Sequence, residues 1–245
     1  MFPIQIAVPT RYPPVVTWAL IAANVAVFLF QLSLTPSELE LFLSRFALIP
    51  ARYLAAPPYA GARQALVDYL PFFSNMFLHG GLLHLILNMW TLWLFGPTVE
   101  DRLGSGRYLV FYLACGLLAS VSHAIFNPTS TIPALGASGA ISGVLGSFIL
   151  MFPLAELVIV IPILFFPFFF QVPAIVFAGF WFVSQVLAGT VELFAPSGGG
   201  GIAWWAHIGG FVAGIALTPV MHRSKQRYRA YYADEGILGF DTKGR

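Results

Sequence analysis

Charged residues are scarce in this 245-residue chain, and cysteine is almost absent. Only 9% of the residues are Asp, Glu, Lys or Arg, while 58% are hydrophobic; soluble domains average about 25% charged and about 45–50% apolar residues. This shortage of charge excludes a soluble globular protein and predicts one that crosses a membrane several times. Cys115 is the single cysteine, so no intramolecular disulfide can form.

Three missing patterns narrow the chemistry further. The sequence has no His-Glu-x-x-His motif, and no cysteine or carboxylate lies at the depth of its intramembrane histidines, so we expect no metal and no cofactor. The first 14 residues lack the basic region and cleavage site of a signal peptide, so residues 15–34 are expected to be a retained span. No half-repeat relates the first three spans to the last three, which disfavours a small transporter.

Apolar runs of about 20 residues are long enough to cross the hydrocarbon core of a bilayer as helices. Five runs have this length, and a sixth, residues 138–152, is shorter and ends before Pro153. The five are residues 15–34, 77–95, 108–126, 173–193 and 202–221. We therefore predict an all-α membrane protein with six transmembrane helices formed by residues 1–221, followed by a basic tail, residues 222–245.

Two connections are apolar without being simple spans. Residues 35–73 mix charged and apolar side chains, which is typical of amphipathic segments that lie partly in the membrane surface. Residues 154–172 are apolar but contain and adjoin several prolines, and a broken backbone is costly in lipid. We interpret this segment as an extended or interfacial connection; a seventh span, the alternative, would place the two chain ends on opposite sides.

Basic residues near the spans predict the orientation. The segment from His222 to Arg229 is the densest basic cluster and directly follows the last apolar run, so the C-terminus is expected to be cytoplasmic. With six spans the N-terminus and a loop at residues 100–107 lie on the same side. We expect a multi-pass protein of the cell (inner) membrane. Anchoring to the lipid bilayer explains the basic tail, and no nucleic-acid partner is expected.

Histidines inside the predicted spans are costly in lipid and are therefore candidates for function. With six spans, His79 and His84, Ser138, and His207 all lie near the outer ends of parallel helices. His207 is about six residues into its run, hence about 9 Å deep, and the short helix that begins at Ser138 is about 22 Å long, which sinks its serine by about 8 Å. The two depths agree, and His123 is interpreted as interfacial.

Small residues give these helices a means of close approach. Two pairs of glycines are each spaced four residues apart, Gly139 with Gly143 and Gly210 with Gly214. Such small-xxx-small faces let helices pack tightly, and His207 shares a helix side with Gly210. Packing of the two faces would bring Ser138 within reach of His207, and a serine–histidine pair supports acyl transfer.

The remaining polar residues suggest supporting roles. His84 and Asn88 are four residues apart and present donors from one helix face, and the backbone N–H of Ser138 is a third candidate donor for an oxyanion. His79 is expected about 140° around the same helix from His84. Four further residues are interpreted as interhelical hydrogen-bonding residues: Asn24, Gln31, Ser184 and Gln185.

Four motifs occur together in a fixed order: His79-Gly-Gly-Leu-Leu-His84-Leu-Ile-Leu-Asn88, Gly96-Pro-Thr-Val-Glu100-Asp-Arg-Leu-Gly104, Gly136-Ala-Ser138-Gly139 and Ala206-His207-Ile-Gly-Gly210. With this set the chain resembles the rhomboid family of intramembrane serine proteases over roughly residues 72–217. The resemblance implies a six-helix core whose substrates are single-pass membrane proteins with a helix that unwinds near the outer surface.

The resemblance also implies roles for individual residues. Ser138 would be the nucleophile and His207 the general base, with His84, Asn88 and the Ser138 amide as the oxyanion site and His79 as the additional histidine of the family. Ser142 stands where some members carry an aromatic ring that stacks on the catalytic histidine. The resemblance therefore names no residue that orients His207.

Two hypotheses complete the sequence-based picture. The linker at residues 194–201 contains four consecutive glycines, and its flexibility would let the fifth span or its cap move and admit a substrate. The leading function is an intramembrane serine endopeptidase. The alternatives are a catalytically silent rhomboid relative that binds membrane proteins and, with less support, the transporter.

Overall fold

A computed structural model describes residues 2–54, 66–163, 166–194 and 203–222. The glycines at residues 198–201 and the basic tail beyond His222 lie outside the described residues. The hypothesis of a flexible linker and the proposed division at residue 221 therefore stay predictions.

Long apolar helices dominate the structure, as the composition predicted. Within the described residues, five helices are long and apolar enough to cross a membrane. They are α1 (Val15–Ser33), α5 (Leu82–Leu103), α6 (Ser105–Phe126), α8 (Ala174–Phe194) and α9 (Trp204–Met221). The shorter apolar helix is α7 (Ser138–Met151). The chain is a mostly helical, multi-pass membrane protein.

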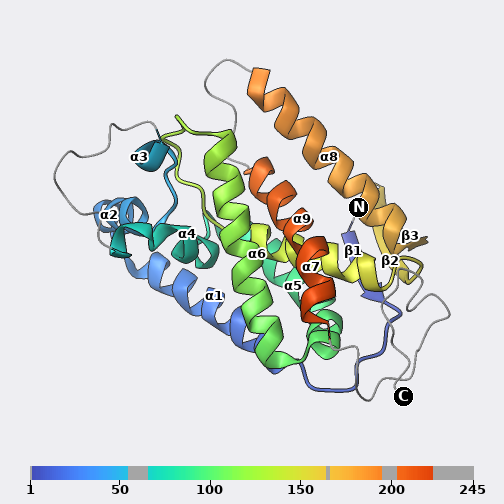
Figure 1. The fold of residues 1–245 in the computed structure, drawn as a ribbon. Coiled ribbons are helices and arrows are strands. Elements are labelled where there is room, and N and C mark those ends of the chain that lie inside the picture. Colours follow the sequence, from blue (N-terminus) through green and yellow to red (C-terminus); the bar gives the residue numbers. More distant parts are fainter. Residues whose placement is uncertain (1, 55–65, 164–165, 195–202, 223–245) are drawn as a thin grey trace.

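The long connection between α1 and α5 is a series of short helices that gather on one side of the bundle (Figure 1). They are α2 (Pro36–Phe46), α3 (Ala51–Leu54), η1 (Leu66–Tyr69), α4 (Pro71–Ser74) and η2 (Asn75–Phe77). A reciprocal capping box between Thr35 and Glu38 begins α2. The hydrogen bonds from the Thr35 hydroxyl and backbone N–H lower the pKa of the Glu38 carboxyl.

A three-stranded antiparallel sheet lies at the opposite side of the bundle, beside the start of α8 (Figure 1), and an all-α description is wrong in this respect. Its strands are β1 (Phe2–Ile6), β2 (Glu156–Ile163) and β3 (Phe166–Pro173), in the order β1-β2-β3. The hairpin of β2 and β3 is the connection that the prolines predicted to be extended. Two of them, Pro162 and Pro167, are paired, and Pro167 is tolerated because β3 is an edge strand.

The junction of α5 and α6 differs from the predicted loop at residues 100–107. Helix α5 continues past Pro97 to Leu103, and α6 begins at Ser105. Gly104 alone connects them, with a φ of 80° that favours glycine. Three charged residues of the predicted loop, Glu100, Asp101 and Arg102, are instead buried at the end of α5.

These buried charges have partners on the N-terminal side of the chain. The Glu100 carboxylate accepts hydrogen bonds from the Val16 and Thr17 backbone N–H groups at 2.9 and 2.8 Å and from the Thr17 and Ser105 hydroxyls at 2.8 and 2.7 Å. The first N–H groups of a helix lack intrahelical partners, and its N-terminus favours a negative charge. Glu100 therefore holds the start of α1 against the end of α5.

Helix α7 lies inside the bundle, between α9, α6 and α5. Every residue from Gly139 to Phe148 is buried. The N-terminal half of this helix is rich in glycine, alanine and serine, so its neighbours can approach its backbone. The helix that begins at Ser138 is thus the best-packed element of the structure.

Replacing Glu100 by alanine should strongly destabilise the fold. The change would leave two buried N–H groups and two hydroxyls without their acceptor, and we expect the free energy of unfolding to fall by about 3–5 kcal/mol. Chemical denaturation of the purified protein in detergent measures this loss. The exposed Glu40→Ala variant is the control, with an expected change within about 0.5 kcal/mol; equal effects of the two changes would contradict the capping role.

Candidate active site

Ser138 and His207 lie side by side although 69 residues separate them in the chain. Ser138 is the first residue of α7, and His207 lies in the first turn of α9. The Ser138 Oγ and the His207 Nε2 are 2.8 Å apart, which is a normal hydrogen-bond distance. The arrangement is that of a nucleophile next to a general base.

The two helices meet through their backbones at the four glycines of the small-residue faces. A Cβ atom at Gly210 would overlap the carbonyl oxygen of Gly139, and one at Gly214 would overlap the carbonyl oxygen of Gly143. Any larger residue would push α9 away from α7. These contacts fix the separation of the helices beside Ser138 and His207, since Gly139 directly follows Ser138 and Gly210 is three residues after His207.

The same α7 glycines also contact α6 on another side. A Cβ at Gly139 would lie 2.6 Å from the Cβ of Ala119, and one at Gly143 would lie 2.5 Å from the Cβ of Cys115. Gly146 contributes a further close contact, with the backbone of Phe211, that the sequence analysis missed. The sequence could have indicated this contact, because Gly146 is three residues beyond Gly143 and therefore near it on the helix surface.

The segment before Ser138 is tied to the connection that precedes α5. Leu48 and Ala134 form an isolated antiparallel bridge, and the Gly136 N–H donates to the Asn75 carbonyl at 2.9 Å. Gly136 has a φ of 126°, and a Cβ there would lie 2.7 Å from the Cε1 of His84. Glycine is required both for the backbone conformation and for the approach of the imidazole.

His84 and Asn88 reach the same place from α5. The Asn88 Nδ2 is 3.6 Å from the Cβ position of Gly136, two residues before Ser138. This nitrogen is buried and has no hydrogen-bond partner among the described residues. The structure therefore brings a donor of hydrogen bonds, already removed from water, close to Ser138.

The prediction that His79 and His84 share one helix is wrong. Helix α5, which carries His84, begins at Leu82, so His79 lies in the connection before it. The two imidazole rings pack edge to face with their centroids 5.2 Å apart. His79 is buried, and its backbone is held by two 3.1 Å hydrogen bonds with the side chain of Gln31 on α1. Gln31, predicted to hydrogen-bond between helices, thus bonds the connection before α5 instead of another helix.

A cavity of about 460 Å³ opens beside Ser138 and His207. Its walls come mainly from α5, α7 and α8, and Pro3 of β1 also lines it. Most of the lining is apolar: Leu87, Trp90, Phe95, Ile141, Phe177 and Trp181. The cavity combines an apolar volume with a few polar groups, among them His84, Asn88 and Ser138, which is typical of a binding site.

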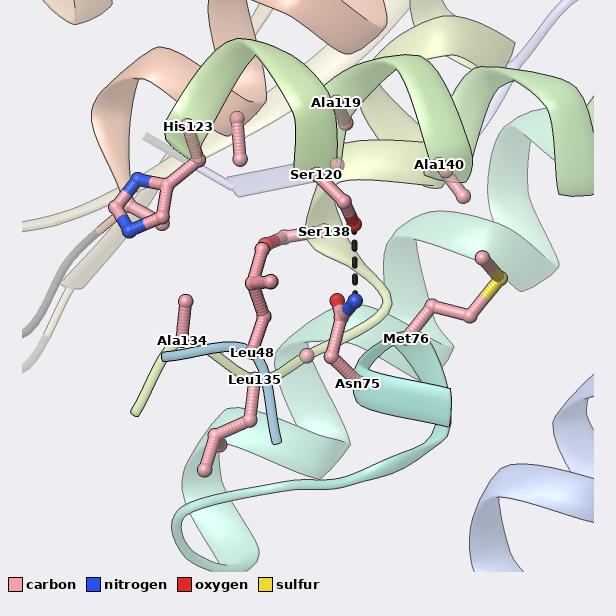
Figure 2. Close-up of a pocket in the computed structure, with 15 residues that line it drawn as sticks. Leu48, Asn75, Met76, Ala119, Ser120, His123, Ala134, Leu135, Ser138 and Ala140 are labelled. Carbon is pink, nitrogen blue, oxygen red and sulfur yellow. Dashed lines mark hydrogen bonds between the residues drawn. The ribbon is translucent and has the colours of Figure 1, made fainter. Parts of the chain in front are cut away.

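A second, much smaller cavity lies on another side of Ser138 (Figure 2). Its volume is about 20 Å³, enough for one water molecule. Asn75 donates to the Ser120 hydroxyl at 2.9 Å across it, as the dashed line in Figure 2 shows. His123, interpreted from the sequence as interfacial, is buried and lines this cavity.

His207 has a second polar partner that the resemblance did not supply. Its Nδ1 lies 2.7 Å from the Oε1 of Gln185 on α8. The sequence analysis expected an interhelical hydrogen bond from Gln185 but not its connection to His207. The rings of Trp181 and Trp204 also lie near the imidazole, with centroid distances of 6.0 and 6.2 Å.

A serine hydrogen-bonded to a histidine between apolar helices defines a membrane protein with the groups of a serine hydrolase. The Rhomboid domain family matches residues 67–224, and the chain belongs to the rhomboid family. The sequence is similar to the rhomboid protease GluP of Bacillus subtilis, with 47% identity over 70 residues that cover 29% of this chain and 13% of that protein.

Two other relatives match longer stretches. Rhomboid protein 1, mitochondrial, of Saccharomyces cerevisiae is 26% identical over 225 residues, which cover 88% of this chain and 57% of the yeast protein. The rhomboid protease GlpG of Klebsiella pneumoniae is 30% identical over 113 residues, 46% of this chain and 36% of that protein. The chain thus spans between about an eighth and just over half of the length of these three relatives.

Replacing Gly214 by alanine should force α9 away from α7. The new Cβ meets the backbone of Gly143, which cannot rotate away, so we expect the free energy of unfolding to fall by about 1–3 kcal/mol. Denaturation in detergent measures the change. Gly179→Ala on α8, where a Cβ meets nothing within 4 Å, is the control; the close backbone contact is contradicted if the two variants are equally stable.

Proposed function

We propose that this protein is an intramembrane serine endopeptidase that cleaves transmembrane segments of single-pass membrane proteins. The observation that carries the proposal is the 2.8 Å hydrogen bond between Ser138 Oγ and His207 Nε2 beside an apolar cavity of about 460 Å³. Membership of the rhomboid family, with relatives named rhomboid proteases, supports the same conclusion.

The first step is attack by Ser138 on a peptide carbonyl. His207 Nε2 takes the hydroxyl proton as Oγ bonds to the carbonyl carbon, and the carbonyl oxygen becomes an oxyanion. The imidazolium then gives this proton to the leaving amine as the peptide bond breaks. The product of this step is an acyl-enzyme at Ser138 and a released amine.

The oxyanion requires donors that are already in place. The unpartnered Asn88 Nδ2 and the neighbouring His84 ring lie on the α5 side of Ser138. The Ser138 N–H lies at the start of α7, where backbone N–H groups lack intrahelical partners. We assign these three groups to the oxyanion site and His79, packed on His84, to its support.

Hydrolysis of the acyl-enzyme requires a water molecule next to Ser138. The cavity of about 20 Å³ is large enough for one, and its walls carry polar groups of Asn75, Ser120 and His123. In this step His207 removes a proton from the water as its oxygen attacks the ester carbon. The bond between this carbon and Oγ then breaks, Oγ takes the proton from the imidazolium, and the carboxylic acid product leaves. Serine and histidine return to their starting states.

The substrate would reach the site from the lipid. The large cavity is walled by α5 and α8, and α8 has many exposed apolar side chains along its length. With the proposed topology, both termini are cytoplasmic and Ser138 lies towards the outer face of the cell membrane. A substrate helix that unwinds near this face would present its backbone carbonyl to Ser138.

Covalent labelling tests the serine–histidine pair. A fluorophosphonate probe should label the purified protein in detergent, and the Ser138→Ala and His207→Ala variants should lose labelling and cleavage of a transmembrane substrate, because both groups are needed to form the nucleophile. Gel fluorescence and a cleavage assay measure the two activities. Labelling that persists in Ser138→Ala, or a wild type that neither labels nor cleaves, favours the catalytically silent relative.

The oxyanion assignment predicts a specific defect for Asn88→Leu. Loss of one preorganised donor should lower kcat by roughly 10²–10³-fold with little change in KM. The control is Asn24→Leu, which removes another buried amide whose Nδ2 bonds only its own helix at Leu20. Steady-state cleavage kinetics measure kcat and KM, and thermal unfolding verifies that each variant is folded. A wild-type kcat in both variants would contradict the assignment.

A further inference from the structure

We propose that Gln185 is the positioning residue of the catalytic histidine: its Oε1 accepts the Nδ1–H of His207 and leaves Nε2 unprotonated toward Ser138. This inference rests on the proposed function, in which His207 is the general base. It assigns a third member to the pair, an uncharged side chain from α8.

The contact is short and sheltered. Gln185 Oε1 and His207 Nδ1 are 2.7 Å apart, and Gln185 is 6% exposed. Because Gln185 lies on α8 and His207 on α9, the bond crosses between two apolar helices. A hydrogen bond is stronger in such surroundings than in water, so the contact constrains the imidazole ring.

The other end of the amide determines which way it points. Gln185 Nε2 donates to the Trp181 carbonyl at 3.3 Å and to the Ser184 hydroxyl at 2.9 Å. A backbone carbonyl can only accept, so the NH₂ group must face Trp181 and the oxygen must face His207. The Ser184 hydroxyl is free to accept, because its own proton goes to the Trp181 carbonyl at 2.5 Å.

The direction of the amide fixes the tautomer of His207. An oxygen facing Nδ1 requires a proton on Nδ1, and in a neutral imidazole the other nitrogen then has a lone pair. That lone pair lies 2.8 Å from Ser138 Oγ. A continuous series of donors therefore runs from the Ser138 hydroxyl through His207 and Gln185 to the Trp181 carbonyl.

Other residues around the ring do not supply this acceptor. Ser142, at the position where an aromatic ring would stack, instead donates to the Ser138 carbonyl at 2.7 Å. Trp181 and Trp204 approach the imidazole with their rings, which pack against it and accept no ordinary hydrogen bond in the ring plane. Within the described part of the chain, the hydrogen-bond partner of His207 Nδ1 is Gln185.

Two variants of Gln185 separate an acceptor role from a packing role. Gln185→Met keeps the length and shape of the side chain but removes the acceptor. Gln185→Glu keeps an oxygen that can accept from Nδ1 while placing a carboxyl in an apolar region. A packing role predicts that Met is tolerated and Glu is harmful, whereas the positioning role predicts the reverse order of activity.

We expect Gln185→Met to lower kcat by roughly 10–100-fold with KM within about twofold, because a fraction of His207 adopts the tautomer that cannot take the serine proton. Gln185→Glu should retain at least several times more kcat than Gln185→Met. Thr190→Val, an exposed change on the same helix, should behave as wild type. Wild-type kcat in Gln185→Met, or lower kcat in Gln185→Glu than in Gln185→Met, would overturn the assignment.

A spectroscopic measurement tests the tautomer independently of catalysis. The tautomer can be read by nitrogen-15 NMR of protein with isotope-labelled histidine, in which the His207 signals are those missing from His207→Ala. In the wild type we expect a protonated Nδ1 and an unprotonated Nε2. In Gln185→Met we expect a mixture of the two tautomers. An unchanged tautomer in Gln185→Met overturns the positioning role. If the fluorophosphonate probe does not label Ser138 of the wild type, the proposed function is refuted instead. The tautomer measurement still decides the role of Gln185 in that case.

Discussion

The backbone contact between α7 and α9 is the constraint on which the candidate site depends. Gly210 and Gly214 approach the carbonyl oxygens of Gly139 and Gly143 so closely that no side chain fits between the two helices. In a membrane the tails of the lipids are as apolar as the side chains, so close van der Waals packing is what holds helices together. Ser138 and His207 lie at the N-terminal end of this contact, where a hydrogen bond between two side chains joins the same two helices.

Several buried polar groups elsewhere in the structure have hydrogen-bond partners within the protein. Glu100 is buried, yet its oxygens accept from backbone and hydroxyl groups at the start of α1. Gln31 pairs with the backbone of His79, and Gln185 with His207 and the backbone of its own helix. Asn88 Nδ2 differs because it is buried and unpartnered among the described residues. A buried donor without a partner is costly and therefore needs an explanation. One explanation is that a bound substrate supplies the acceptor.

The sequence could predict those features that depend on local periodicity. The lengths of the apolar runs located four of the long helices to within three residues, whereas α5 begins five residues and ends eight residues later than predicted. Pro153 to Pro173 indicated an extended segment. The spacing of Gly139 with Gly143 and of Gly210 with Gly214 indicated which faces meet. Helix rise and a six-span topology predicted equal depths for Ser138 and His207; the depths stay a prediction, and the structure places the two side chains 2.8 Å apart.

The remaining features depend on contacts between residues far apart in the chain. The pairing of β1 with β2 joins Phe2 to Val160, and no pattern within either segment specifies the other. Glu100 and Arg102 fall in the predicted loop at residues 100–107, but Glu100 caps a helix that begins 85 residues earlier and Arg102 pairs with Asp101. Gln185 could be recognised as interhelical, yet its partner depends on the rotation of α8 about its axis.

The distance in sequence between Ser138 and His207 has a consequence for synthesis of the protein. Helix α7 is made and can enter the membrane before α8 and α9 exist, so its serine initially has neither the imidazole nor Gln185 beside it. An isolated serine hydroxyl is a weak nucleophile. Under the proposed function, Ser138 therefore gains its general base only when α9, the last described helix, docks against α7.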